Sequence, residues 1–138
     1  MTGTLLDTDV VSALRIPHQH NFSFQKWLRS TDLNDCFVSS LTWMEIEVGV
    51  LRKLRTDPSQ GAVLQSWVPV VKSRFANRTI AFDSMAATVS APLWLLRSRG
   101  SVDTLIAGTA LAHQLALATR NTTHFADIPD LTVINPWA

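Results

Sequence analysis

Three acidic residues stand at points in the sequence where a strand is predicted to end or a helix to begin. Asp7 follows the short apolar run of residues 3–6, and Glu45 follows the run 35–38 at the head of a helical stretch. Asp103 opens another helical stretch much farther along the chain. Functional groups of an open parallel sheet gather beyond the carboxyl ends of its strands, so we expect these three carboxylates to share one sheet edge.

Such a set of carboxylates suits a divalent metal ion. Like charges raise one another's pKa, and a hard cation such as Mg²⁺ or Mn²⁺ neutralises them while it keeps several waters. An ion held in this way can activate water and bind phosphate oxygens, which is the chemistry of phosphodiester hydrolysis. The sequence therefore predicts a hydrolytic site with Asp7, Glu45 and Asp103 as metal ligands.

Each of these acids also has a purely structural interpretation. Asp7 can cap the helix after the first strand, and Asp103 can complement a helix dipole. Glu45 lies three residues after Thr42, the spacing of a capping box. Asp9 is interpreted as an ordinary cap or turn acid outside the site. The joint placement of the three acids is what favours the functional interpretation.

Short apolar runs alternate with helical patterns along the chain, which predicts an α/β fold with a mostly parallel, short-stranded sheet flanked by helices.

Individual residues predict how some of the helices begin, bend or end. Pro69 predicts a kink or an early end of its helix, Pro92 predicts a second irregularity, and Ser101 is expected to cap the last helix. One apolar helix face is formed by Met44, Val48 and Leu51. The predicted strands are 3–6, 35–38, 79–81, 118–119 and 132–134, and the predicted helices are 10–15, 22–30, 42–55, 60–75, 84–98 (stopped by Gly100) and 102–117.

The composition predicts a single domain over residues 1–138. With 46% hydrophobic and 17% charged residues, the chain is neither disordered nor of low complexity. A net charge of +1 dictates neither a nucleic-acid nor a membrane partner. No basic leader precedes Asp7, and the longest uncharged stretch, residues 104–119, is shorter than the roughly 20 residues of a membrane-spanning helix. The single cysteine, Cys36, fits a reducing compartment, so we expect a cytoplasmic protein without a membrane partner.

Four segments carry a resemblance to a known family. They are LLDTDVVS, SSLTWMEIEVGVLR, SVDTLIAGTALAHQLALATRNTTHF and LTVINPW, in this order. Together they resemble the PIN-domain ribonucleases, and in particular the VapC-type toxins of bacterial toxin-antitoxin pairs. The resemblance implies a three-layer α/β sandwich with an acidic, Mg²⁺-dependent site that cleaves single-stranded or looped RNA, such as tRNA or rRNA loops. By position, Asp7, Glu45 and Asp103 resemble the first three acids of the family.

The fourth acidic position of the family is occupied here by Asn121. Its amide can orient a water or a hydroxyl in the catalytic set, but it adds no negative charge for a second metal ion. Thr8 and Thr119 resemble the small hydroxyl residues beside the family's acids and are expected to support them. Arg120 adjoins Asn121, so we expect it to contact a substrate phosphate.

The expected partners are an RNA substrate, a cognate antitoxin and a second copy of the chain. Trp43 and Phe125 are candidates for stacking on an RNA base, although burial in the core is the favoured interpretation of each. The resemblance implies an antitoxin that blocks the acidic edge, and a homodimer. The five tryptophans also exceed what the core of one such chain is expected to cover.

Two other functions stay open. Residues 5–11 also resemble the strand end of haloacid-dehalogenase phosphatases, in which Asp7 would be a covalent nucleophile, although the later lysine and acidic pair of that family have no convincing match. Alternatively, the chain is a PIN-like module that binds RNA without cleaving it, which Asn121 permits. RNA cleavage assays of the wild type, Asp7→Asn and Asp103→Asn with Mg²⁺ or Mn²⁺ distinguish these functions.

Overall fold

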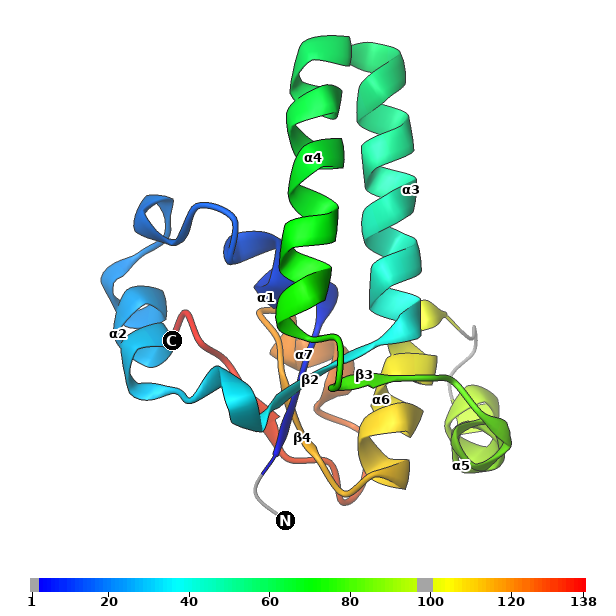
Figure 1. The fold of residues 1–138 in the computed structure, drawn as a ribbon. Coiled ribbons are helices and arrows are strands. Elements are labelled where there is room, and N and C mark those ends of the chain that lie inside the picture. The colour runs from blue at the N-terminus through cyan, green and yellow to red at the C-terminus, as the bar shows by residue number, and fades with distance from the viewer. Residues whose placement is uncertain (1–2, 97–100) are drawn as a thin grey trace.

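The computed structural model of the chain describes residues 3–96 and 101–138 (Figure 1). Within these residues, five strands form one parallel sheet in the order β3-β2-β1-β4-β5. The strands are β1 Thr4–Leu6, β2 Cys36–Ser39, β3 Thr79–Ile80, β4 Ala116–Ala118 and β5 Val133–Ile134. The predicted parallel sheet of short strands is therefore confirmed.

The central strand of this sheet is β1. Its residue Leu5 pairs with Phe37 of β2 on one side and with Leu117 of β4 on the other. The chain first builds β2 and β3 on one side of β1, and then places β4 and β5 on the opposite side. The carboxyl end of β1 thus lies where the strand order reverses, which is the position at which open α/β sheets bind their ligands.

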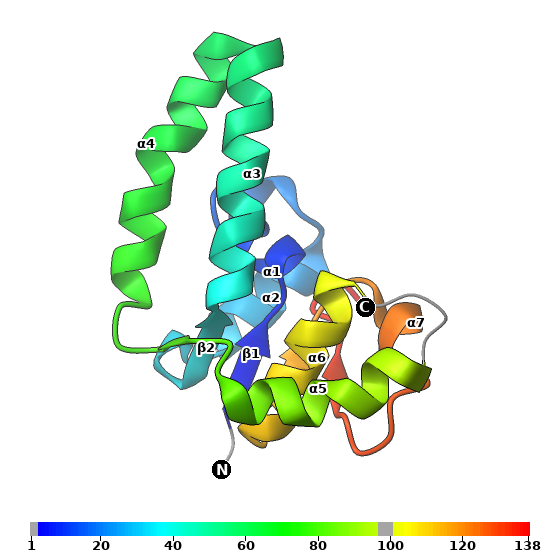
Figure 2. The same cartoon turned by 90° about the vertical axis from the view of Figure 1, so that its right-hand side faces the viewer.

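Helices lie on both sides of the sheet (Figure 1 and Figure 2). They are α1 Thr8–Ala13, α2 Phe22–Ser30, α3 Ser40–Thr56, α4 Pro58–Arg74, α5 Ser84–Leu96, α6 Val102–Ala112 and α7 Thr122–Phe125, with 3₁₀ turns at Pro17–Gln19 and Leu33–Asp35. In the described ranges, no helix combines the length and the apolar character that crossing a bilayer requires.

Each face of the sheet carries its own apolar core, because successive residues of a strand point to opposite sides. Leu6 packs in one core with Val10 of α1 and Trp43 of α3. Leu5 packs in the other core with Ile106 of α6 and Leu117 of β4. Helices therefore cover both faces, and the predicted three-layer sandwich is confirmed.

The long helices α3 and α4 stand side by side and extend beyond the sheet (Figure 1 and Figure 2). Their close approach requires a glycine, because a Cβ on Gly61 would come within 2.7 Å of the Leu54 backbone. Ser39 caps α3, since its Oγ accepts a hydrogen bond from the Leu41 backbone N–H at 3.1 Å. The predicted capping box from Thr42 to Glu45 is wrong, because β2 ends directly at this cap and Thr42 is buried within the helix.

The apolar stripe predicted on α3 does not enter the core. Met44 and Leu51 are 49% and 58% exposed, and Val48 is exposed as well. The residues that α3 buries instead include Trp43 and Ile46, which follow a different helical stripe. The helix therefore presents an apolar surface to solvent.

The predicted helix ends have different outcomes. The predicted helix 60–75 is confirmed as α4, which continues through Pro69 to Arg74, so the early end at Pro69 is wrong. Pro69 lies on the exposed side of the helix, where water can replace the missing hydrogen bond. α5 likewise continues through Pro92. The last long helix, α6, ends at Ala112, since Gln114 adopts a φ of 56° and the following residues pair with β1 as β4.

Two predicted helix signals near residue 100 have different outcomes. Ser101 occupies the predicted N-cap position of α6, but its side chain makes no capping hydrogen bond. The predicted end of the preceding helix near Ser98, with its stop at Gly100, lies outside the described residues. The short helix α7 was not predicted, because its four residues are too few to produce a periodic pattern.

Candidate active site

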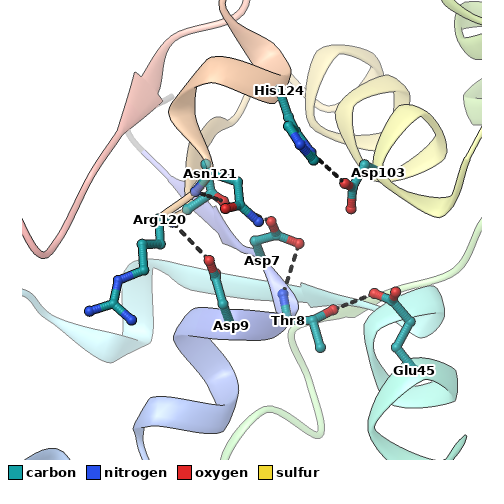
Figure 3. A network of polar contacts seen from close by, with 9 residues as sticks. Asp7, Thr8, Asp9, Glu45, Asp103, Arg120, Asn121 and His124 are labelled. Atoms are coloured by element: carbon teal, nitrogen blue, oxygen red, sulfur yellow. Dashed lines mark hydrogen bonds and ion pairs between the residues drawn. The ribbon is translucent and has the colours of Figure 1, made fainter. Parts of the chain in front are cut away.

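Asp7 occupies the carboxyl end of the central strand and caps α1 (Figure 3). Its Oδ1 accepts a hydrogen bond from the Thr8 backbone N–H at 2.8 Å. Its Oδ2 accepts one from the Thr119 hydroxyl, also at 2.8 Å, at the end of β4. The residue is only 4% exposed. The structural role of Asp7 as a cap and its place at the candidate site are therefore compatible.

The environment of Asp7 disfavours its ionised form. Burial raises the pKa of its carboxyl group from 3.8 to about 6, and the nearby charge of Asp9 adds to this increase. The hydrogen bonds from Thr119 and Thr8 lower the pKa, and Asp103 makes the smallest contribution, an increase. An ionised Asp7 at neutral pH is thus held without a compensating charge, which is the situation that a bound cation relieves.

Asp9, which is predicted to be a cap or turn acid outside the site, lies next to Asp7. Its Oδ2 accepts a hydrogen bond from the Arg120 backbone N–H at 2.9 Å. Its Oδ1 is buried and has no hydrogen-bond partner among the described residues. Burial raises the pKa of Asp9 as well. A signal for this residue was present, because Asp9 follows Asp7 by two positions directly after a strand.

Glu45 reaches the site from α3 and meets Thr8 (Figure 3). The Thr8 hydroxyl donates to Glu45 Oε1 at 2.5 Å, and the Thr8 and Thr42 hydroxyl oxygens lie 3.3 Å apart. Thr8 thus links the residue after β1 to the helix after β2. This places Thr8 beside two of the acids, at Asp7 through its backbone and at Glu45 through its side chain.

Asp103 lies in the first turn of α6 and faces α7. Its Oδ2 is 3.3 Å from Nδ1 of His124, a residue for which the sequence predicts no role in the site. Asn121 is exposed, and its backbone N–H donates to the Thr119 hydroxyl at 3.1 Å. In Figure 3 the Asn121 side chain lies beside Asp7.

The structure brings Asp7, Asp9 and Asp103 within range of one another's charges, and Thr8 joins Glu45 to this group. No three histidine, cysteine or acidic side chains within 3–96 and 101–138 are grouped closely enough to hold a metal ion as they stand. In kind, however, the residues fit a hard divalent cation. All the donors are carboxylate oxygens, one of them without a partner, and the pKa of Asp7 marks uncompensated negative charge.

The residues expected to bind RNA have different outcomes. Arg120 has its backbone at the acidic edge, but its side chain points away from Asp7, Glu45 and Asp103 (Figure 3). Trp43 and Phe125 are only 5% and 1% exposed, because each packs in a core of the sheet. Both are therefore core residues, as the favoured interpretation had it, and neither ring is available to stack on a base.

The protein is an α/β protein with an acidic site at the switch point of its parallel sheet. A buried carboxylate, Asp7, ends the central strand there, and further acids surround it. Residues 4–131 match the family of PIN domains. The chain belongs to the PIN-domain family.

Named relatives agree with this assignment. The chain is 34% identical to Toxin FitB of Neisseria gonorrhoeae over 141 aligned residues, which cover 96% of this chain and 97% of that protein. It is 46% identical to Ribonuclease VapC14 of Mycobacterium tuberculosis over 63 residues. That second match covers 46% of this chain and 60% of the relative's length.

Solved structures share the fold. The crystal structure of FitAcB from Neisseria gonorrhoeae superposes with a TM-score of 0.83 at 33% identity, and the match covers 97% of this chain and 98% of that one. A toxin-antitoxin complex from Klebsiella pneumoniae matches with a TM-score of 0.65 at 27% identity and covers 98% of both chains. The similarity extends over the whole described architecture.

Proposed function

We propose that this protein is a metal-dependent endoribonuclease that acts as the toxin of a toxin-antitoxin pair, with residues 1–138 forming one nuclease domain. The observation that carries the proposal is the buried Asp7 at the switch point of the sheet, with its raised pKa and its acidic neighbours Asp9 and Asp103. The names of the relatives, a ribonuclease and a toxin, support the same function.

Asp7, Glu45 and Asp103 are the residues that would hold Mg²⁺ or Mn²⁺. When bound, the ion supplies a water of lowered pKa and compensates the charge that develops on a phosphodiester. The chain's own contribution is to keep the carboxylates oriented. Thr119 and the Thr8 backbone fix both oxygens of Asp7, and the Thr8 hydroxyl fixes Glu45.

The remaining residues act around these acids. Asn121 lies beside Asp7 and orients a water or a ribose hydroxyl through its neutral amide. Arg120 binds a phosphate of the RNA at the edge of the site, since its backbone is held at the acids by Asp9. The substrate class is single-stranded or looped RNA, with tRNA and rRNA loops as the first candidates.

The proposed partners are a cognate antitoxin that covers the acidic edge and a second copy of the chain, and the proposed compartment is the cytoplasm. Relatives found in toxin-antitoxin complexes support the first partner. The second is supported by α5, which has no charged residue over 84–96 and exposes Trp94, Leu95 and Leu96. An uncharged, apolar helix face suits packing against an identical copy.

The proposed function is tested by incubating the purified protein with structured RNA and Mg²⁺ or Mn²⁺. We expect cleavage by the wild type and a loss of more than about 100-fold in Asp7→Asn and Asp103→Asn, because a lost metal ligand costs at least as much as a lost supporting residue. Glu47→Gln, an exposed acid on α3, serves as the matched control.

Other outcomes of this assay have defined meanings. Normal cleavage by both variants contradicts a metal-dependent site at these acids. Hydrolysis of small phosphate esters without RNA cleavage assigns Asp7 as the nucleophile of a phosphatase. RNA binding without cleavage in any divalent metal identifies an RNA-binding module that has lost catalysis.

A further inference from the structure

The guanidinium group of Arg120 lies on the indole ring of Trp137, with Cζ 4.6 Å from the ring centroid. Trp137 is 8% exposed, whereas Arg120 is exposed. The cation therefore lies over an aromatic ring while the Arg120 residue stays exposed to solvent. Among the described residues, no protein acceptor takes a hydrogen bond from the guanidinium group.

Trp137 is held in place by three hydrogen bonds and by aromatic stacking. Its Nε1 donates to His20 Nδ1 at 3.3 Å, and its carbonyl oxygen accepts from Asn21 Nδ2 at 3.0 Å. Its backbone N–H donates to Asn135 Oδ1 at 2.9 Å. The ring stacks on Phe24 of α2 with centroids 4.7 Å apart and an interplanar angle of 28°. The indole is therefore a rigid platform fixed to α2.

The backbone of Arg120 is fixed independently at the acids. Its N–H donates to Asp9, and the flanking residues Thr119 and Asn121 are joined by a hydrogen bond of 3.1 Å. Figure 3 shows the side chain extending away from Asp7. A cation anchored at both ends in this way cannot fold back over the acids, so it lies to one side of the place where a reacting phosphate would bind.

A guanidinium group that lies over an aromatic ring and donates no hydrogen bond to the described protein residues is preorganised to bind phosphate oxygens, because less side-chain freedom is lost on binding. We propose that Trp137 is a positioning residue that holds Arg120 as a binding site for a phosphate next to the cleaved one in the RNA. This inference rests on the proposed ribonuclease function and adds a specific substrate contact and its support.

The proposal is tested by measuring the affinity for a short fluorescent single-stranded RNA in the inactive Asp103→Asn background. We expect Arg120→Ala to raise the Kd about threefold to tenfold. The slope of log Kd against the logarithm of the salt concentration should also decrease by about 0.7, which is the effect of losing one phosphate contact on a single strand. We expect Trp137→Leu to raise the Kd as well, and Trp137→Phe, which keeps an aromatic face for the cation, to stay close to the wild type.

The double variant Arg120→Ala/Trp137→Leu separates positioning from a general structural effect. We expect Trp137→Leu to add nothing once Arg120 is absent, and in the active enzyme to raise KM while kcat changes less than about twofold. If Trp137→Leu weakens RNA binding as much in the Arg120→Ala background as in the presence of Arg120, the proposal is overturned, since Trp137 would then act through the fold.

Arg29→Ala is the matched control, because the Arg29 guanidinium lies over the Phe22 ring of α2, 5.9 Å from its centroid, but does not adjoin the acids. Equal weakening by Arg29→Ala also overturns the proposal.

Nuclear magnetic resonance gives a readout that needs no RNA. The Arg120 side-chain protons should be shifted by the indole ring current, and this shift should vanish in Trp137→Leu and persist in Trp137→Phe. Absence of the shift in the wild type overturns the positioning role. If the shift is present but Arg120→Ala leaves RNA affinity unchanged while the wild type still cleaves, the phosphate site is wrong and the proposed function stands. If the wild type neither binds nor cleaves RNA, the proposed function fails and this inference fails with it.

Discussion

The Thr8 hydroxyl donates a hydrogen bond of 2.5 Å to Glu45 Oε1 and so connects the exits of two neighbouring strands. Thr8 begins α1 directly after β1, and Glu45 lies in α3 after β2. A hydroxyl donor to a carboxylate fixes the direction of that carboxylate and stabilises its ionised form. Thr8 is therefore a link between the two halves of the acidic site.

Replacing Thr8 by valine keeps the shape of the side chain but removes this donor. We expect Thr8→Val to lower RNA cleavage by about 10-fold to 100-fold, the usual effect of losing a group that orients a metal ligand. The fold should survive, because the cap of α1 uses the Thr8 backbone. Cleavage rates against Mg²⁺ concentration measure the effect, and Thr8→Ser should retain activity. Wild-type rates in Thr8→Val would mean that Glu45 needs no such support.

The raised pKa of Asp7 predicts that this acid destabilises the metal-free fold at neutral pH. A carboxyl group with a folded pKa of about 6 and an ordinary value of 3.8 favours folding fully below pH 3.8 and loses that contribution as the pH rises through 6. We therefore expect Asp7→Asn to stabilise the metal-free protein at pH 7 by about 1 to 3 kcal/mol while cleavage is lost. Denaturant unfolding at pH 4 and pH 7 measures the difference, which should shrink at pH 4.

Mg²⁺ provides the control for this prediction. At pH 7 it should raise the melting temperature of the wild type and have little effect on Asp7→Asn, since a ligand stabilises only the folded state that binds it. An Asp7→Asn variant that is less stable than the wild type at pH 7 would show that the cap of α1 outweighs the burial of the charge.

The resemblance to PIN-domain ribonucleases puts Asn121 at the position of a fourth acid, and its side chain points toward Asp7 in Figure 3. We expect Asn121→Asp to preserve cleavage and to shift the Mg²⁺ requirement to lower concentrations, because it adds a negative charge to the proposed cation site. Isothermal titration with Mg²⁺ and Mn²⁺ measures the change. Abolished cleavage in this variant would show that the neutral amide itself is required. Asn77→Asp, at an exposed position after α4, is the control.

The packing of α5 against α6 depends on Gly108, where a Cβ would lie 1.9 Å from Ser90 Oγ. We expect Gly108→Ala to destabilise the fold by about 1 to 3 kcal/mol, because the helices must separate to accommodate the methyl group. Cleavage should fall as well, since α6 positions Asp103. Gly49→Ala is the control, because a Cβ there meets nothing within 4 Å, and it should stabilise α3 by up to about 1 kcal/mol.

The exposed apolar end of α5 predicts a self-association surface. Leu95 is 86% exposed, so Leu95→Asp should leave the fold intact and convert a dimer to a monomer, because a charge would be buried in an apolar contact. Light scattering after size-exclusion chromatography measures the mass. Val63→Asp on α4, where Val63 is 51% exposed, should leave the dimer unchanged. A monomeric wild type would contradict the proposed homodimer.

The alternation of strands and helices was predictable because it depends on local sequence, namely on apolar runs and on residues that end helices. The strand-end positions of Asp7 and Glu45 followed from the same local patterns. Helix faces were less predictable. Met44 and Leu51 lie on a regular apolar stripe of α3, yet they are exposed, because periodicity reveals an apolar face without revealing what covers it.

The contacts made by the acids could not be predicted from the sequence either. Asp9 resembles many turn residues, and only the fold places its carboxylate within range of the Asp7 charge and its Oδ2 on the Arg120 backbone N–H. The pairing of His124 with Asp103 spans two helices that no spacing rule relates. Both contacts arise from the return of the chain to β4 on the far side of β1.

By itself the sequence determined the class of fold, the acids at the strand ends and the resemblance to PIN-domain ribonucleases, because residue type and short-range periodicity carry that information. The tertiary structure alone decided which hydroxyl orients which acid, that the Arg120 side chain turns away from the acids onto Trp137, and which aromatic residues are buried. These features depend on contacts between residues far apart in the sequence, such as Thr119 and Asp7, which are 112 positions apart, and such contacts exist only once the strands are paired.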